Sequence, residues 1–185
     1  GFTVTVNVQK LNKELPAQAL NEGQFDLALC FGPGFHRIPE GLAKQVLLED
    51  DLVCVMDAQF APQCASIDLE TFTQRHHVYP TPWTSDTNMV DGWLQRQGRE
   101  RHIITRANSY RAALQLLEGT DFILVLPRRI QTLLATASWV TVFELPPDLP
   151  EFTLDMVWSR HLEEDEANGW FREQVVKVCA EQGLL

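Results

Sequence analysis

The fold class is set by the first thirty residues, GFTVTVNVQKLNKELPAQALNEGQFDLALC (1–30). Residues 2–8 alternate apolar and polar side chains with a strict period of two, which predicts a strand. Asn12 can cap a short helix that ends at Gly23, and the apolar run 25–30 then predicts a buried strand. A strand, a helix and a strand within about 30 residues are typical of a βαβ unit. We therefore expect an α/β fold.

The alternation of strands and helices continues along the rest of the chain. Helices are predicted to begin at Ser66, at Ser85 or Asp86, at Asn108 or Ser109, after Pro127 and near Glu163. Apolar runs predict strands at 42–48, 52–56, 76–80, 102–107, 122–127, 139–145 and 152–159. Strands that alternate with helices indicate mostly parallel sheets.

Composition excludes several classes of protein. The 185 residues are 45% hydrophobic and carry a formal charge of -10, which argues against direct binding of nucleic acid. No apolar run reaches the roughly 18 to 20 residues of a membrane span, and the N-terminus lacks the layout of a signal peptide. We therefore expect a soluble, cytoplasmic protein without a membrane partner.

Motifs for catalysis, metals and cofactors are absent from the sequence. The four cysteines form no C-x-x-C pair, and buried reduced thiols are the simplest interpretation. There is no G-x-S-x-G, H-E-x-x-H, Walker A or G-x-G-x-x-G. Cys30 and His36 are close enough in sequence for a thiol and base pair, but no third group orients them. We expect neither an enzyme nor a metal or cofactor protein.

Polar and aromatic residues gather where predicted strands end. In an open α/β sheet these junctions line one crevice, and free backbone N–H groups there suit a small polar or anionic molecule. Ordinary helix capping is an alternative explanation for Asn12, Ser66, Ser85 and Ser109 taken singly. The junctions lie at 11–13, 31–36, 81–87 and 108–110.

Five motifs in order resemble the effector-binding domain of LysR-type transcriptional regulators. They are LPAQALNEGQFDLALCFGP (15–33), GLAKQVLLEDDLVCVM (41–56), GTDFILVLPRRI (119–130), FELPPDLPEFTLDMVWSRH (143–161) and NGWFRE (168–173). Asp121 and Phe171 depart from the general family pattern. Together with the Leu-Pro-Arg-Arg ending at 126–129, they resemble the subgroup of nodulation and aromatic-degradation regulators.

The resemblance implies a fold like that of type II periplasmic binding proteins. Two Rossmann-like subdomains are joined by two crossover strands, which we place near 52–56 and 151–154. Residues 1–51 and 152–185 would form one subdomain, and residues 52–151 the other. The family's first strand and helix of this domain would precede the chain.

The resemblance also implies function and partners. The expected role is sensing of a small-molecule effector and homo-oligomerisation, as a dimer or as a tetramer in the full-length protein. DNA would be bound only through an N-terminal helix-turn-helix outside the chain. The alternative is a solute-binding protein of the same fold that serves a transporter.

Candidate effector contacts follow from the junctions and from one arginine. Seven of the fifteen basic residues lie between 91 and 130, and Arg128 stands just beyond a predicted strand end. Helix N-termini and Lys13 favour an anionic effector. The predicted contacts are Asn12, Lys13, Phe31, Gly32, Thr81, Thr84, Ser85, Thr87, Asn108, Ser109, Tyr110 and Arg128.

Overall fold

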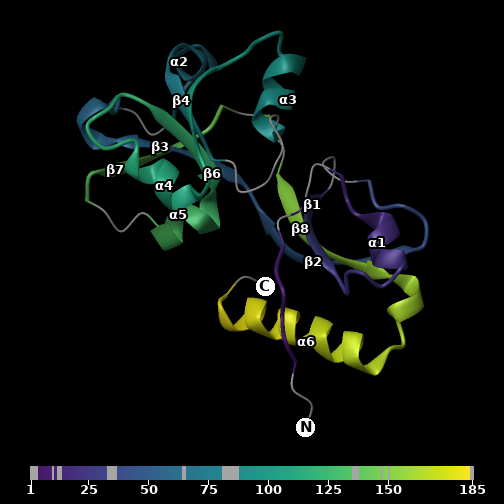
Figure 1. The fold of residues 1–185 in the computed structure, drawn as a ribbon. Helices are drawn as coiled ribbons and strands as arrows, with labels where there is room; N and C mark the ends of the chain where they lie inside the picture. Colours follow the sequence, from purple (N-terminus) through teal and green to yellow (C-terminus); the bar gives the residue numbers. More distant parts are fainter. Residues whose placement is uncertain are drawn as a thin grey trace.

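The computed structural model describes residues 4–9, 11, 14–32, 37–63, 66–80, 88–134, 138–146, 148–149 and 151–183. These residues form a mixed α/β structure with two sheets (Figure 1). One sheet has the order β1 (Ala28–Gly32), β8 (Phe152–Ser159) and β2 (Leu42–Asp50). The other has the order β5 (His102–Ala107), β4 (His76–Pro80), β6 (Ile123–Pro127), β3 (Leu52–Asp57) and β7 (Val140–Glu144).

Helices cover both faces of the three-stranded sheet. Leu20 of α1 (Ala17–Asn21) packs against one face with Val157 of β8. Cys179 of α6 (Glu166–Glu181) packs against the other face with Met156 and Trp158. Successive side chains of β8 point to opposite faces, so this one strand contributes to both cores.

The five-stranded sheet also has a core on each face. Phe72 of α2 (Leu69–Gln74) and Trp93 of α3 (Met89–Arg96) pack on one face. Leu114 of α4 (Tyr110–Gln115) packs on the other, and Ile130 of α5 (Arg128–Leu134) adds to that core. Short 3-10 helices at Ala58–Phe60 and Arg160–Leu162 complete the described elements.

The chain passes between the sheets at two places. Asp51 alone separates β2 from β3, and residues 145–151 separate β7 from β8. The predicted crossovers at 52–56 and 151–154 thus fall in β3 and at the start of β8. The assignment of 1–51 with 152–185 and of 52–151 to two subdomains stays a prediction.

The expectation of mostly parallel sheets is wrong. Strand β8 is antiparallel to β1 and β2, and β3 is antiparallel to β6 and β7. Among the described strands, the parallel pairs are β4 with β5 and β4 with β6. Two consecutive strands that pair in parallel need a crossover connection, usually a helix. The chain instead enters β3 and β8 directly from the other sheet.

The strand predicted at 2–8 is also wrong over its described residues. Residues 4–9 have no regular secondary structure, and Val4, Val6 and Val8 are 47%, 57% and 88% exposed. An alternating pattern makes a strand only where a neighbouring strand accepts its hydrogen bonds and covers its apolar face. No described strand does this for residues 4–9.

Four helices begin later than predicted. Helix α1 begins at Ala17 with Pro16 at the N-cap position rather than after a cap at Asn12, and Asn88 rather than Ser85 or Asp86 caps α3. Asp68, not Ser66, caps α2 and accepts a hydrogen bond from the Thr71 N–H at 2.7 Å. Asp165 caps α6, which therefore begins at Glu166 rather than near 163. Even α6, the longest described helix at 16 residues, falls short of a membrane span, and the other helices of the described chain do too.

Candidate functional site

A cavity lies between the two sheets, at the carboxyl ends of β4 and β6. Pro80 and Pro127, the last residues of those strands, line it from one sheet, and Phe31 and Phe152 line it from the other. Its unfilled space is about 480 Å³, including space open to solvent. Because β4 and β6 are parallel, their carboxyl ends meet at one edge, where α/β proteins commonly bind ligands.

The walls of the cavity are mainly apolar. The rings of Phe31 and Phe152 meet edge to face, with centroids 5.1 Å apart. The remaining apolar walls come from Leu52, Met89, Val90 and Val125, in addition to the two prolines. Such a surface favours a ligand with substantial apolar area.

Three described lining side chains carry nitrogen or oxygen: Tyr79, Asn88 and Tyr110. Asn88 caps α3, and its Oδ1 accepts a hydrogen bond from the Asp91 N–H at 3.1 Å. The Asp91 carboxylate in turn accepts from the Asn88 N–H at 3.3 Å, which completes a capping box. The amide is therefore held in place at the cavity.

We call the side chains of Tyr79, Asn88 and Tyr110 the polar rim, and Arg101, which is outside the cavity lining, contacts Asn88. Arg101 Nε donates to Asp91 Oδ1 at 2.7 Å and its Nη2 donates to Asn88 Oδ1 at 3.2 Å, with the side chain only 2% exposed. The guanidinium groups of Arg101 and Arg106 lie 5.7 Å and 4.9 Å from the Tyr79 ring centroid. Burial raises the pKa of Tyr79, so its hydroxyl stays neutral at pH 7.

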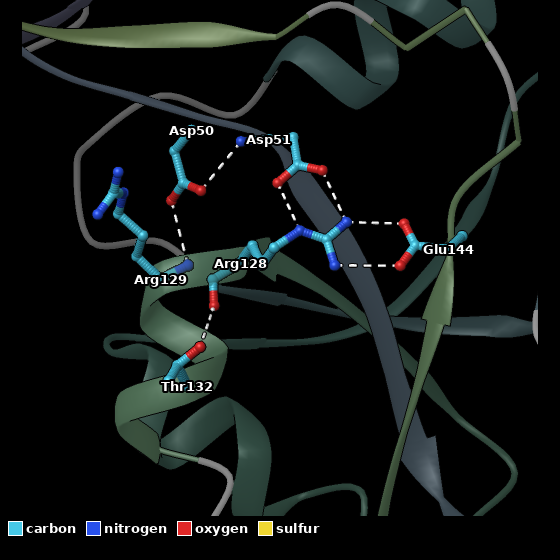
Figure 2. Close-up of polar contacts among 6 residues, drawn as sticks. All are labelled: Asp50, Asp51, Arg128, Arg129, Thr132 and Glu144. Atoms are coloured by element: carbon cyan, nitrogen blue, oxygen red, sulfur yellow. Dashed lines mark hydrogen bonds and ion pairs between the residues drawn. The ribbon is translucent and has the colours of Figure 1, made fainter. Parts of the chain in front are cut away.

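Tyr110 lies in the cavity lining, and Asp50 lies near it but outside that lining. Burial raises the pKa of Tyr110, and the neighbouring Tyr79 and Asp50 raise it further. Burial also raises the pKa of Asp50, whose carboxylate accepts from the backbone N–H groups of Arg129 at 3.2 Å and Asp51 at 3.0 Å (Figure 2). Asp50 thus acts on the Tyr110 hydroxyl as a nearby negative group.

Arg128, Asp51 and Glu144 form an ionic group that we call the Arg128 cluster (Figure 2). Arg128 Nε and Nη2 each donate to the Asp51 carboxylate at 2.7 Å. Its Nη1 and Nη2 donate to the Glu144 carboxylate at 3.0 Å and 2.7 Å. The hydrogen bonds with Arg128 lower the pKa of Asp51. All three guanidinium nitrogens are therefore occupied by carboxylates at the β2–β3 junction.

Arg129 links α5 to the end of β2 and to Gly183, the residue that follows α6 by two positions. Its Nε donates to the Glu49 carbonyl at 3.4 Å and its Nη1 donates to the Gly183 carbonyl at 3.0 Å. The backbone N–H of Arg128 also donates to the Asp51 carbonyl at 2.9 Å. The start of α5 is thereby tied to the strand that connects the sheets.

Gly32 lies beside a buried charge rather than at the cavity wall. A Cβ at Gly32 would come within 2.6 Å of Asp155 Oδ2. Asp155 is 1% exposed and accepts from Lys44 Nζ and from the Thr153 hydroxyl, both at 2.7 Å. Burial, reinforced by Asp155, raises the pKa of Cys30 to about 11, so this thiol is a poor nucleophile near pH 7.

The structure places the sequence-predicted residues in different settings. Phe31 and Tyr110 line the cavity, whereas Gly32, Asn108, Ser109 and Arg128 are not among its lining. Ser109 caps α4 by accepting from the Ala112 N–H at 3.2 Å. Asn12, Lys13, Thr81, Thr84, Ser85, Thr87 and His36 lie outside the described residues.

Sequence reasoning missed most of the apolar walls and part of the polar rim. Tyr79 precedes the proline that ends a predicted strand, a position that could have marked it as a strand-end residue. Asn88 stands three residues before an acidic residue, which is the spacing of a capping box. Phe152 follows a proline-rich breaker, and nothing local indicates that it faces a cavity.

The described residues include no group of three or more His, Cys, Asp or Glu side chains that could hold a metal ion. The chemistry of the cavity, as far as the described side chains define it, is hydrogen bonding by neutral groups and apolar contact.

Comparison with known proteins gives one consistent result. A family model described as the LysR substrate binding domain matches residues 2–180. The HTH-type transcriptional activator NahR of Pseudomonas putida is 26% identical over 84% of this chain and 51% of its own length. Nodulation protein D 2 of Sinorhizobium fredii is 26% identical over 89% of this chain and 52% of its own.

A solved structure agrees with these relatives. The probable transcriptional regulator PA0477 from Pseudomonas aeruginosa superposes with a TM-score of 0.78 and 29% identity, over 89% of this chain and 54% of that one. The chain thus spans about half the length of the regulators that it matches.

Proposed function

The chain belongs to the family of LysR substrate-binding domains, and from this membership we propose that it is the effector-sensing and oligomerisation domain of a bacterial transcriptional regulator. Its fold is the one that regulatory domains of this family share with type II periplasmic binding proteins. Its relatives are regulators, which favours sensing over delivery of a solute to a transporter.

The observation that carries the proposal is the cavity between the sheets. Phe31 and Phe152 reach it from the three-stranded sheet, and Tyr79 and Tyr110 reach it from the five-stranded sheet side. A ligand that touches residues of both sheets binds most tightly to the relative orientation of the sheets in which both sets of residues contact it. Its binding therefore shifts the population towards that orientation.

We propose that the two sheets belong to two subdomains, residues 1–51 with 152–185 and residues 52–151. The Arg128 cluster supports this division, because Asp51 is the residue between β2 and β3 and Glu144 ends β7 just before the chain returns. The cluster thus binds both connections together at the point where a change of subdomain orientation would be accommodated.

The remaining parts of the proposal concern the longer protein. We place it in the cytoplasm as a homodimer, or as a tetramer at full length, without catalytic activity. DNA would be contacted by a helix-turn-helix domain outside these 185 residues, and the oligomer would pass on the orientation of the subdomains.

A thermal-shift panel of small organic molecules tests the proposal. The 185-residue chain is compared with Met89→Trp, which places a large side chain in the cavity, and with Leu116→Trp, which adds the same ring at an exposed position. Ligands of the cavity should raise the Tm of the wild type and of Leu116→Trp but not that of Met89→Trp. A ligand at about 100 times its Kd adds about 2.7 kcal/mol of stability. Ligands that stabilise all three proteins equally would argue against the cavity as the sensing site.

A further inference from the structure

The charge of the effector can be inferred from the groups that surround the cavity. None of the described lining side chains carries a formal charge, and their nitrogen and oxygen atoms belong to Tyr79, Asn88 and Tyr110. These groups are phenol hydroxyls and a carboxamide, which exchange hydrogen bonds with hydroxyl and carbonyl groups.

Arg101 and Arg128 are both committed to carboxylates of the protein. Arg101 binds Asp91 at 2.7 Å and is almost fully buried by its surroundings. Arg128, which the sequence placed among the effector contacts, gives all its guanidinium nitrogens to Asp51 and Glu144. Neither guanidinium lines the cavity, so neither is positioned to neutralise a bound anion.

Charges of both signs lie just outside the cavity lining: the Arg101 and Arg106 guanidinium groups beside Tyr79, and the Asp50 carboxylate near Tyr110. Burial is the main cause of the raised pKa of Tyr110, and the Asp50 carboxylate adds to it; that carboxylate is held in place by the N–H groups of Asp51 and Arg129 (Figure 2). An anion beside Tyr110 would lose hydration without gaining a cation, and it would face a like charge. Both effects disfavour a carboxylate effector.

We infer that the cavity binds an uncharged ring compound with a hydroxyl or carbonyl group, its rings against Phe31 and Phe152 and its polar group towards Tyr79, Asn88 and Tyr110. This inference rests on the proposed function, and it replaces the anionic effector expected from the sequence. Aromatic walls supply edge and face contacts to such a ring, and the neutral rim satisfies its polar group.

Matched pairs of compounds test the inference on the 185-residue chain. Each pair shares a ring and differs in charge: benzyl alcohol with benzoate, 2-naphthol with 2-naphthoate, and indole-3-carbaldehyde with indole-3-carboxylate. Calorimetric or thermal-shift titrations at pH 7 should give a Kd at least about tenfold lower for the uncharged member, a difference of about 1.4 kcal/mol. Equal or tighter binding of the carboxylates overturns the inference.

Asp50→Asn gives a second, independent arm. Removal of the negative charge beside Tyr110 should lower the Kd of the carboxylates relative to their uncharged partners by severalfold. Glu49→Gln is the matched control, because it removes the same charge from the adjacent, exposed residue. An unchanged ratio in Asp50→Asn, or an equal change in both variants, contradicts the role assigned to Asp50.

The two proposals fail in different ways. If the carboxylates bind the wild type as tightly as their uncharged partners and do not bind Met89→Trp, the cavity remains the sensing site. Only the uncharged ligand class is then refuted. Absence of binding by every member of the panel refutes the uncharged ring compound as the ligand class, and stabilisation that is insensitive to Met89→Trp refutes the cavity itself.

Discussion

At position 32 the chain has no side chain because a carboxylate occupies the place where one would go. The neighbouring strand places Asp155 Oδ2 2.6 Å from the position of a Gly32 Cβ, and the Thr153 hydroxyl oxygen is 3.2 Å from it. The carboxylate cannot easily retreat, since Lys44 and Thr153 both bind it. The sequence marks Gly32 only as part of a loop after a strand, and the partner that requires glycine lies more than a hundred residues away.

Gly32→Ala should therefore destabilise the protein by about 1–3 kcal/mol, the usual cost of overpacking a filled site. Urea denaturation followed by circular dichroism measures the change. Gly92→Ala is the control, because a Cβ at that helical position meets only the end of Arg96 at 3.9 Å and should stabilise α3 by roughly 0.5–1 kcal/mol. Equal effects of the two substitutions would contradict the packing described for Gly32.

His77 gives the chain a pH-dependent stability. Burial, assisted by the charge of Arg101, lowers the pKa of His77 from 6.5 to about 4, and one ring nitrogen lies 2.8 Å from the Phe72 carbonyl oxygen. The unfolded chain binds a proton below about pH 6.5 but the native chain only below about pH 4. The contribution of neutral His77 is thus complete above pH 6.5 and is lost as the pH falls towards 4.

His77→Gln should flatten this part of the stability profile, because glutamine keeps a hydrogen-bonding group and does not titrate. The wild type should lose on the order of 3 kcal/mol between pH 6.5 and 4 from this residue alone. Chemical denaturation at stepped pH measures the slope, with exposed His102→Gln as the control. The same slope in the wild type and in His77→Gln would show that another group is responsible.

At the scale of elements, helix α5 is fixed to Asp51 and Glu144 by the ion pairs of Arg128, whose side chains are not deeply buried. The side chains of Arg128, Asp51 and Glu144 are 39%, 41% and 59% exposed. Single exposed pairs contribute little, but a guanidinium that binds two carboxylates forms a network. Loss of the arginine also leaves the two carboxylates to repel each other.

Arg128→Gln should lower the free energy of unfolding by about 1 kcal/mol at low ionic strength, and by less at 0.5 M salt because the ions are screened. Lys177→Gln, which removes one exposed 3.9 Å pair with Glu181, should change it by no more than about 0.5 kcal/mol. Denaturation curves at two salt concentrations separate the cases. A salt-independent loss in Arg128→Gln would indicate that packing, not charge, is the cause.

The sequence predicted the elements well where the pattern is local, and the site poorly where contacts are distant. The apolar runs that became β3, β4, β5, β6 and β8 have clear limits in the sequence. The valines of 4–9 show the weakness of the same pattern, since alternation says nothing about a partner strand. Arg128 looked available for a ligand because its carboxylates are 77 and 16 residues away, beyond the reach of any local motif.

At the scale of the whole molecule, charge sets the conditions for self-association. Each copy has a formal charge of -10, so two copies repel each other at long range. The proposed dimer should therefore form more tightly as salt rises from about 0.05 to 0.5 M, because the screening length falls from roughly 14 Å to roughly 4 Å and the repulsion weakens. Sedimentation velocity measures this dependence. Dissociation by salt would instead indicate ion pairs across the interface.

The place of β8 in the chain has a consequence for biosynthesis. This strand is the centre of the three-stranded sheet, yet it comes about a hundred residues after its partners β1 and β2. On the ribosome, all strands of the five-stranded sheet are therefore complete before β8 exists, and β1 and β2, which emerge before that sheet, must wait for β8. The nascent chain therefore carries β1 and β2 without their central partner while the five-stranded sheet is being made, a period in which chaperones can recognise them.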